Sequence, residues 1–372
     1  MILQNILPAV LCVLALICCI IEATLTEKLQ NSGADFTTLI QSNNRSSTNE
    51  IFKIISTYSM YILLISGMFC YTSIDHKIGT FAIISEVLAL WMSDIMKMHY
   101  SHPRPFWWNS DVEGIICGRG WGAPSGHALM VAAVVGYFAG EFVKNNKEKA
   151  LAVSIGAIII VLVDFDRVYV GVHFYFQVIH GNIMGFCIAF LLLNDKIRGY
   201  IKRSFGDKKF VLIVNFVFGI LWMWGILLYL YRDPDWDKDW SNNFSSDCSG
   251  DLTKTDSMRE ACRESTFILF LAGFWVGKHF LTQIPASYTW KTFIYGTLFF
   301  IPALIIDQCL EYLTKTYGDF LTTFICFSII RFISGFVISF VIPLIVFKII
   351  NWKKIDYERT LNNPNNFSER YV

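Results

Sequence analysis

Three short segments in the first half of the chain concentrate cationic and histidine side chains. The first contains Lys97 and Arg104, the second is the run Pro-Ser-Gly-His at 124–127, and the third contains Arg167 and His173. Arg binds phosphate oxygens in a bidentate fashion, and Lys adds a compact positive charge. A histidine can attack phosphorus or protonate a leaving oxygen. The set is therefore suited to phosphoryl transfer.

The Pro-Ser-Gly-His run also predicts a helix start that binds an anion. Ser125 and Gly126 stand where a helix is expected to begin, and the free backbone N–H groups and dipole of a helix start attract negative charge. No Asp cluster and no Cys/His spacing typical of a metal site accompanies them. The sequence therefore predicts no metal and no cofactor, and cationic side chains are expected to stabilise the transition state.

Composition indicates what must position these residues. Of the 372 residues, 54% are hydrophobic and 16% are charged, whereas soluble domains average about 25% charged residues. This excludes an ordinary soluble domain and intrinsic disorder. The net charge of +1 gives no sign of a nucleic-acid partner. The chain is expected to lie in a membrane.

Apolar stretches predict an all-α fold, a polytopic membrane helical bundle of nine to ten spans. A helix needs about 20 apolar residues to cross a hydrocarbon core of ~30 Å. The candidate spans are 2–24, 51–72, 78–98, 126–143, 149–165, 174–194, 210–230, 265–283, 292–312 and 319–348. On this division, the three chemical segments all fall at span ends on one membrane face.

The chain divides into four parts. Residues 1–24 are either a cleaved signal peptide or an extra first span. Residues 25–50 form a lumenal segment, 51–350 the membrane domain and 351–372 a cytoplasmic tail.

Lys and Arg residues set the expected orientation, because cytoplasmic loops are enriched in them. They gather in the loops 143–149 and 195–209 and in the tail, which places the chemical segments and the acidic loop 231–264 in the lumen. The sequons at Asn44 and Asn243 are glycosylation candidates there. In an oxidising lumen Cys248 and Cys262 could form a disulfide.

Several other residues are expected to have structural or surface positions. Trp107 and Trp108 are expected in an interfacial aromatic belt. His102 and His180 are expected to be structural, with His180 on the cavity floor. Arg119 either attracts an anionic substrate or is a solvated loop charge.

The order K-x6-RP, PSGH and R-x5-H resembles the three signatures of the type 2 phosphatidic acid phosphatase superfamily. Within it, the chain most resembles the glucose-6-phosphatase family. The details are RPFWW from Arg104, Cys117 and Gly120 ahead of PSGHA, and HFxxQV from His173. The resemblance covers about 51–350 and implies that this part is a phosphatidic acid phosphatase type 2 core.

The resemblance implies a role for each motif residue. His173 would be the nucleophile that forms a phosphohistidine, and His127 the general acid and then base. Five residues would hold the phosphoryl group: Lys97, Arg104, Ser125, Gly126 and Arg167. The implied reaction is hydrolysis of glucose 6-phosphate in the lumen of the endoplasmic reticulum, as in gluconeogenesis. A glucose-6-phosphate transporter and membrane lipids would be partners.

Two positions depart from the wider superfamily. Asp166 stands where Ser is usual, and Gln177 stands where an Asp orients the nucleophilic histidine, although the glucose-6-phosphatase family shares this Gln. Gln177 lies one helical turn after His173 and could accept a hydrogen bond from its Nδ1. Asp164 or Asp166 could supply the missing charge.

Two alternatives remain open on the sequence. One keeps the chemistry and takes a lipid phosphate, such as phosphatidate or a sphingoid-base phosphate, through an entrance open to the bilayer. The other is a non-catalytic membrane scaffold or transport component that retains the motifs without turnover. The RPFWW and HFxxQV details favour the sugar phosphate by resemblance.

Overall fold

The structure is a computed structural model that describes residues 2–42, 46–145, 149–281, 293–299, 301–302, 305, 309 and 320–349. Within these ranges it contains helices and no strands. The sequon at Asn44, the tail 351–372 and about half of the expected span 292–312 lie outside them.

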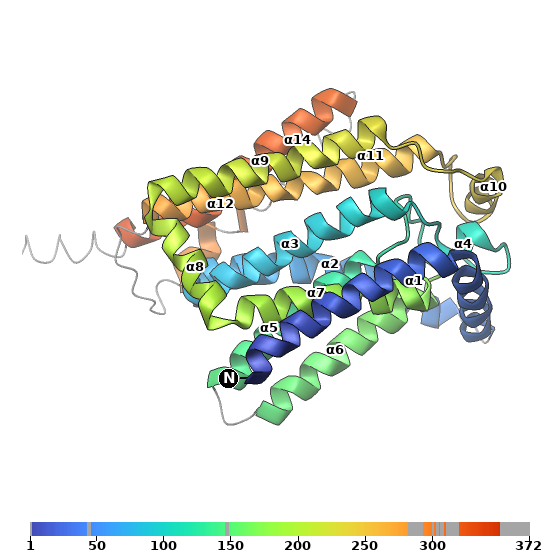
Figure 1. The fold of residues 1–372 in the computed structure, drawn as a ribbon, viewed down its shortest axis with the longest axis horizontal. Coiled ribbons are helices and arrows are strands. Elements are labelled where there is room, and N and C mark those ends of the chain that lie inside the picture. The colour runs from blue at the N-terminus through green and yellow to red at the C-terminus, as the bar shows by residue number, and fades with distance from the viewer. Residues whose placement is uncertain are drawn as a thin grey trace, which may run out of the picture.

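The main helices run along the long axis of the molecule, with α8 at one end and the short helices α4 and α10 at the other (Figure 1). A π-helical segment, Cys70–Ile74, follows α2, a short 3₁₀ turn, Ser265–Phe267, precedes α12, and a second π-helical segment, Val337–Val341, follows α14. The α-helices are α1 (Ile2–Gln41), α2 (Ser46–Phe69), α3 (His76–Tyr100), α4 (Pro105–Trp108), α5 (Gly126–Asn145), α6 (Lys149–Tyr169), α7 (Tyr175–Leu193), α8 (Asp195–Gly206), α9 (Lys208–Tyr231), α10 (Lys238–Asp247), α11 (Lys254–Glu264), α12 (Ile268–Leu281) and α14 (Phe320–Phe336).

Six described helical stretches are long and apolar enough to cross a membrane: Ser46–Ile74, His76–Trp108, Gly126–Val143, Tyr175–Leu193, Lys208–Tyr231 and Phe320–Ile349. A bent pair at the N-terminal end, Leu7–Glu22 and Thr24–Gln41, makes a seventh if it counts as one span. The expected nine to ten spans are not confirmed within the described ranges.

Two expected spans form helices that do not meet this length and composition. α6 carries Asp164, Asp166 and Arg167 in its last two turns, so its apolar part is short. α12 has 14 residues, which is about 21 Å at 1.5 Å per residue and shorter than a ~30 Å hydrocarbon core. Apolar composition alone did not separate these helices from full spans.

α5 packs extensively and closely against α7. Gly181 and Gly185 on α7 face the first turn of α5, and a Cβ on Gly181 would lie 2.6 Å from the carbonyl oxygen of Ser125. Small residues spaced by four allow membrane helices to approach this closely. The contact fixes the start of α5, which carries the Pro-Ser-Gly-His run, against the helix that follows His173.

α1 is a bent helix that lies along α7 and then turns across the end of the bundle (Figure 1). Leu25 has non-helical backbone angles (φ −121°, ψ 20°), and the two halves meet at 84°. The second half contacts the loops around the chemical segments. Gln41 donates to the carbonyl of Tyr169 at 2.7 Å, and Trp108 donates to Asn31 at 2.9 Å.

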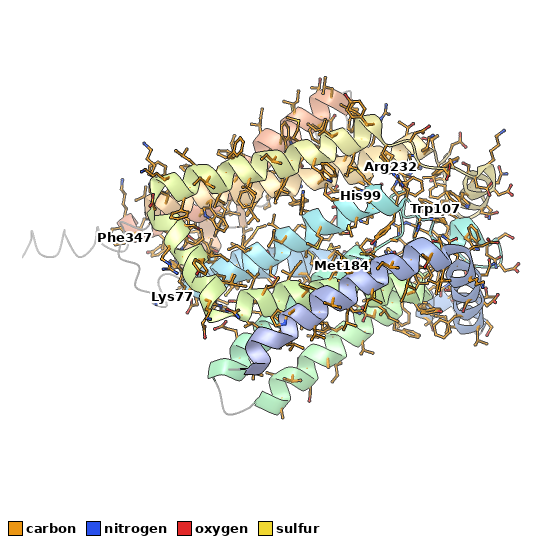
Figure 2. All side chains as sticks on the ribbon, viewed as in Figure 1. Lys77, His99, Trp107, Met184, Arg232 and Phe347 are labelled. Carbon is orange, nitrogen blue, oxygen red and sulfur yellow. A yellow bond between two sulfur atoms is a disulfide. The ribbon has the colours of Figure 1, made fainter. Side chains whose placement is uncertain are left out.

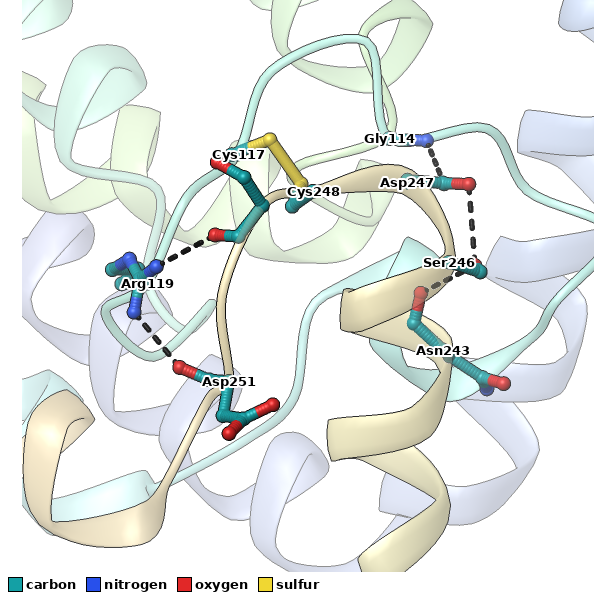
Figure 3. Close-up of a disulfide and its surroundings, with 9 residues drawn as sticks. Gly114, Cys117, Arg119, Asn243, Ser246, Asp247, Cys248 and Asp251 are labelled. Carbon is teal, nitrogen blue, oxygen red and sulfur yellow. Dashed lines mark hydrogen bonds between the residues drawn. A yellow bond between two sulfur atoms is a disulfide. The ribbon is translucent and has the colours of Figure 1, made fainter.

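The acidic loop between α9 and α12 folds into α10 and α11, and we call residues 232–264 the cap. The cap packs on α4 and α3. Arg119 donates to the backbone carbonyls of Ser249 and Asp251 at 3.0 and 2.9 Å (Figure 3). Arg119 therefore binds the cap, a contact that neither of the two expectations for it included.

The disulfide joins Cys117 to Cys248 (Figure 3), so the expected pairing of Cys248 with Cys262 is wrong. Cys248 directly follows α10, beside Asp247, which accepts a hydrogen bond from the backbone N–H of Gly114 at 2.6 Å. Cys262 lies instead on the buried side of α11, and burial raises the pKa of its thiol. The cross-link therefore ties the cap to the segment that precedes the Pro-Ser-Gly-His run.

Trp107 lies in a buried aromatic cluster and not in an interfacial belt. Its ring is fully buried and contacts Trp121, Trp236 and Phe244 at centroid distances of 6.1 to 6.5 Å. The amide nitrogen of Asn243 donates to the carbonyl of Trp107 at 2.8 Å. Glycosylation of Asn243 stays a prediction, and it would modify the atom that makes this contact.

The two ends of the bundle differ in the way the orientation prediction requires. α8, which carries most of the basic loop 195–209, lies at the end opposite to α4 and α10 (Figure 1). Lys77 and Phe347 lie at the α8 end, and Trp107 lies at the cap end (Figure 2). Which end faces the lumen remains a prediction.

The disulfide generates a direct test. In non-reduced protein, peptide mapping by mass spectrometry should find Cys117 linked to Cys248 and Cys262 as a free thiol. Cys248→Ser should lower the melting temperature in detergent, because native disulfides contribute about 2–4 kcal/mol. Cys262→Ser is the matched control and should leave the link intact. A Cys248–Cys262 peptide would contradict the structure.

Candidate active site

His173 lies in the short connection between α6 and α7 and is 3% exposed. Its Nδ1 lies 2.8 Å from the backbone carbonyl oxygen of Gly122 and 3.4 Å from Oε1 of Gln177. A carbonyl oxygen can only accept a hydrogen bond, so Nδ1 must carry the proton. The lone pair of the imidazole is then on Nε2, which lies 3.5 Å from Nη1 of Arg104.

The surroundings of His173 keep its ring neutral. Burial is the largest cause that holds its pKa well below the usual value, and the positive charges of Arg104 and Arg167 add to the effect. A neutral imidazole with an unprotonated Nε2 is the form that can attack phosphorus.

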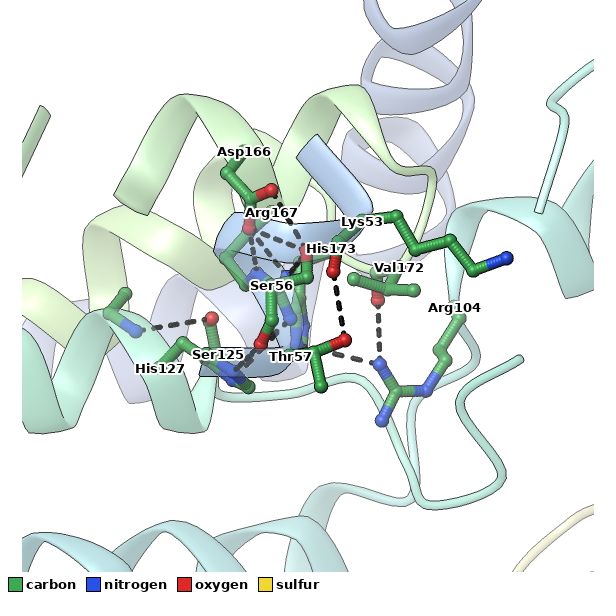
Figure 4. Close-up of polar contacts among 11 residues, drawn as sticks. Lys53, Ser56, Thr57, Arg104, Ser125, His127, Asp166, Arg167, Val172 and His173 are labelled. Carbon is green, nitrogen blue, oxygen red and sulfur yellow. Dashed lines mark hydrogen bonds and ion pairs between the residues drawn. The ribbon is translucent and has the colours of Figure 1, made fainter. Parts of the chain in front are cut away.

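Arg104 is held rigidly at the start of α4. Its Nε donates to the carbonyl of Gly120 at 2.6 Å. Its Nη1 donates to the carbonyl of Val172 at 3.0 Å (Figure 4). Both bonds go to backbone carbonyls. The guanidinium is therefore fixed near the edge of the imidazole that carries the Nε2 lone pair.

His127 and Arg167 meet on the other side of the site. Nη1 of Arg167 lies 3.4 Å from both ring nitrogens of His127, whose Nε2 is 3.2 Å from the carbonyl oxygen of Ser56 (Figure 4). Arg167 also donates to the carboxylate of Asp166 and to the hydroxyl of Ser56. α2, α5 and α6 therefore each contribute a group to this cluster.

Lys97 and Gly126 form the third side. Nζ of Lys97 pairs with Asp94 at 2.8 Å, and it would lie 3.5 Å from a Cβ added to Gly126. The hydroxyl of Ser93 would lie 2.9 Å from the same Cβ, so a larger residue at this helix start would require the Ser93 side chain to move. Ser125 accepts at its hydroxyl from the backbone N–H of Ala128 at 3.4 Å. Within the described ranges, no group of three or more His, Cys, Asp or Glu side chains is arranged to hold a metal ion.

A cavity of about 400 Å³ opens next to these residues. Lys97, Gly126 and His127 line it, as do Glu260 and Glu264 of α11. The remaining lining comes from α2, α3, the turn before α12 and α14: Ser56, Thr57, Met60, Tyr61, Leu64, Leu90, Ser93, Asp94, Phe267 and Arg331. The cavity lining thus includes two of the predicted phosphate-binding residues, Lys97 and Gly126, together with two residues of the cap.

Comparison with known proteins agrees with this arrangement. Residues 79–198 match the PAP2 superfamily. This PAP2 segment contains all three chemical motifs, and the match supports membership of the superfamily.

Curated relatives of different specificity match the same region. An undecaprenyl-diphosphatase from Sulfolobus acidocaldarius is 29% identical over 44% of this chain and 79% of its own length. Phosphatidylglycerophosphatase B from Bacillus subtilis is 28% identical over 39% of this chain and 70% of its own length. Glucose-6-phosphatase catalytic subunit 1 from Mus musculus is 28% identical over 36% of this chain and 43% of its own length. The match therefore spans less than half of the glucose-6-phosphatase subunit.

Asp164 and Asp166 form hydrogen bonds with other side chains, and the expectation that one of them supplies the charge that orients His173 stays a prediction. Asp164 accepts from the amide of Asn182 at 2.5 Å, and Asp166 binds Arg167 and Ser56. Gln177 does reach Nδ1, and it also accepts from the backbone N–H of Phe174 at 3.2 Å. The shorter contact to Nδ1 comes from the carbonyl of Gly122.

Sequence reasoning missed Gly122, Ser56 and Glu260 as members of the site. Ser56 lies in an apolar stretch outside the PAP2 segment, where a single Ser gives no signal. Glu260 lies more than 130 residues after the Pro-Ser-Gly-His run. The glycines before that run predict a tight approach of the backbone, but they do not indicate which carbonyl faces His173.

Gly122→Ala should lower kcat by about 10- to 100-fold, the usual cost of disturbing a group that orients a reactive side chain. The added Cβ would lie 2.6 Å from the carbonyl oxygen of Pro103 and 2.9 Å from the side-chain amide of Gln177, so the Gly122 carbonyl must shift. Steady-state kinetics with p-nitrophenyl phosphate measures the change.

Gly219→Ala, in α9, is the matched control. Among the residues that the structure describes, no atom outside α9 lies within 4 Å of the Cβ that it would add, so kcat should stay within about threefold. Equal losses in both variants would contradict the role of the Gly122 carbonyl.

Proposed function

We propose that the chain is an integral-membrane phosphomonoesterase that works through a phosphohistidine on Nε2 of His173. The observation that carries the proposal is the bond from Nδ1 to the Gly122 carbonyl, which leaves the Nε2 lone pair beside Arg104. The PAP2 superfamily match and the phosphatase relatives support the reaction class.

The first step transfers the phosphoryl group. The Nε2 lone pair attacks phosphorus, a P–N bond forms, and the bond to the leaving oxygen breaks. An anionic phosphate beside His127 favours its charged form, and His127 then gives a proton to the leaving oxygen. Arg104, Arg167 and Lys97 stabilise the negative charge on the phosphoryl oxygens.

The second step restores the enzyme. His127, now neutral, takes a proton from a water molecule as that water attacks the phosphohistidine. The P–N bond breaks, inorganic phosphate leaves, and Nε2 regains its lone pair. The same residue thus acts as acid and then as base.

The cavity favours a hydroxyl-rich leaving group, and we assign the substrate as a sugar phosphate, with glucose 6-phosphate the best candidate. Glu260 and Glu264 line the same cavity as Lys97 and His127, and carboxylates can accept hydrogen bonds from sugar hydroxyls. A volume of about 400 Å³ falls in the range of small-molecule sites. The resemblance to the glucose-6-phosphatase family supports the same assignment.

A lipid phosphate is the second candidate, and two observations favour it. The relatives matched over most of their length are an undecaprenyl-diphosphatase and a phosphatidylglycerophosphatase. Met60, Tyr61 and Leu64 of α2 line the same cavity and offer an apolar wall to an acyl or isoprenoid chain.

The proposal also includes the compartment that the active site faces, the lumen of the endoplasmic reticulum. The Cys117–Cys248 disulfide lies at the cap end of the bundle, as does the site, and disulfides persist in oxidising compartments. This supports a lumenal active site in the endoplasmic reticulum. A substrate made in the cytoplasm would then require a transporter as a functional partner.

The nucleophile assignment predicts a trappable phosphoenzyme. Wild-type protein incubated with ³²P-labelled glucose 6-phosphate and quenched in alkali should retain label that acid releases, as phosphohistidine does. His173→Ala should show no label and no turnover above background. His279→Ala, which changes a histidine of α12, is the control. Undiminished turnover by His173→Ala would refute the mechanism.

The substrate assignment is tested by kcat/KM on a panel of glucose 6-phosphate, phosphatidate, sphingoid-base phosphate and p-nitrophenyl phosphate. Glucose 6-phosphate should give the highest value. Glu260→Gln should raise its KM by about tenfold, because a hydrogen bond to a charged group contributes about 1.5–3 kcal/mol, and should leave the KM for p-nitrophenyl phosphate unchanged.

Asp239→Asn, which changes an exposed acid of the same cap, is the matched control and should change neither KM. A higher kcat/KM for phosphatidate, unaffected by Glu260→Gln, would select the lipid phosphate instead.

A further inference from the structure

α1 carries a buried carboxylate that faces two histidines of the PAP2 segment. Glu22 is 2% exposed. Its Oε1 lies 3.0 Å from Nδ1 of His180 on α7, and its Oε2 lies 3.9 Å from Nδ1 of His102 in the loop after α3. Oε2 and Nδ1 of His102 have no hydrogen-bond partner within the described ranges. Burying a carboxylate without a partner costs free energy. The contact of Glu22 with His180 therefore requires α1 to lie against α7.

Contacts on both sides of Glu22 keep α1 in that place. The sulfur of Cys12 lies 2.9 Å from that of Cys187 on α7, and the sulfur of Cys19 lies 3.7 Å from Nε2 of His180. Beyond the bend, Gly33 lies so close to Phe174 that an added Cβ would be 2.6 Å from its ring. α1 therefore contacts α7 at Cys187 and His180, and it also contacts Phe174, the residue that follows His173.

His102 begins a short path to the imidazole. The backbone carbonyl of His102 accepts from the N–H of Gly122 at 2.8 Å, and the carbonyl of Gly122 accepts from Nδ1 of His173 at 2.8 Å. The next residue, Pro103, accepts from the side-chain amide of Gln177 at 3.2 Å. The loop that Glu22 contacts thus holds Gly122 and Gln177, the two residues whose oxygens face Nδ1 of His173.

Through His180, Glu22 also contacts α7, the helix that carries Gln177. His180 lies seven residues after His173 and three after Gln177. The Tyr100 ring packs between the two histidines, with ring centroids 5.5 Å from His102 and 5.7 Å from His180. One carboxylate therefore connects the loop 101–104 to α7, the two segments between which the His173 ring is held.

We propose that Glu22 is a positioning residue that clamps His102 and His180 together and thereby sets the orientation of the His173 imidazole. The role rests on the proposed function of His173 as nucleophile. It also requires that α1 remain part of the mature protein, since cleavage near Ala23 would remove Glu22. The proposal therefore requires residues 1–24 to be a retained first span and not a cleaved signal peptide.

Glu22→Gln keeps the size of the side chain and removes the charge. It should lower kcat for p-nitrophenyl phosphate by about 10- to 100-fold, the range for a group that orients a reactive side chain. KM and inhibition by vanadate should change less than threefold, because Lys97, Arg104 and Arg167 still bind the anion. His180→Gln should lower kcat similarly, and the double variant should lose no more than the larger single loss.

Glu27→Gln is the matched control, an exposed carboxylate on the same helix, and should keep wild-type kinetics. Oxidative cross-linking of Cys12 to Cys187 reports whether α1 still lies on α7, and the link should form in Glu22→Gln as in wild type. His173→Ala in the same assay separates the two proposals, since its activity would refute the proposed function itself.

Three outcomes would overturn the clamp. One is wild-type kcat in Glu22→Gln while His173→Ala is inactive. Another is joint loss of cross-link, vanadate inhibition and kcat, which would mean a purely structural role. The last is a mature N-terminus beyond residue 22.

Discussion

The geometry of the candidate site depends on one hydrogen bond, between the imidazole of His173 and the backbone carbonyl of Gly122. Because the carbonyl of Gly122 can only accept, it selects the tautomer of His173 and aims Nε2 at Arg104. A backbone group takes this part where the wider superfamily uses an acidic side chain. The geometry therefore depends on how the segments around Gly122 are packed, including α3, α7, the cap and α1.

Electrostatics imposes the second constraint. Arg104, Arg167 and Lys97 are brought together in a largely buried site, where like charges repel and desolvation is costly. The structure offsets this with carboxylates that were not part of the motif: Asp166 binds Arg167, and Asp94 binds Lys97. Asp166, which departs from the usual Ser, thus has a structural explanation as a counterion.

The chemical motifs and the helical class could be predicted because both are local. Motif spacing places Lys97, Arg104, His127, Arg167 and His173 at helix ends, and the structure brings them into one cluster. The disulfide and the orienting carbonyl could not be predicted, since each depends on which distant segments touch. Cys117 lies 131 residues from Cys248, and nothing in the composition of either neighbourhood indicates the pairing. The number of spans is not confirmed within the described residues, because apolar content does not reveal that α6 ends in three charges and that α12 is short.

The carboxylate partners of the cations also bear on turnover. In the resting site Asp166 and Asp94 occupy the donors that a phosphate would use, so they behave as built-in surrogate ligands. Binding of a phosphate ester is then an exchange of one anion for another and not the filling of an uncompensated positive site. Such competition weakens the affinity of the ground state and of released inorganic phosphate alike, while interactions made only in the transition state keep their full value. An enzyme built in this way resists retention of its own product.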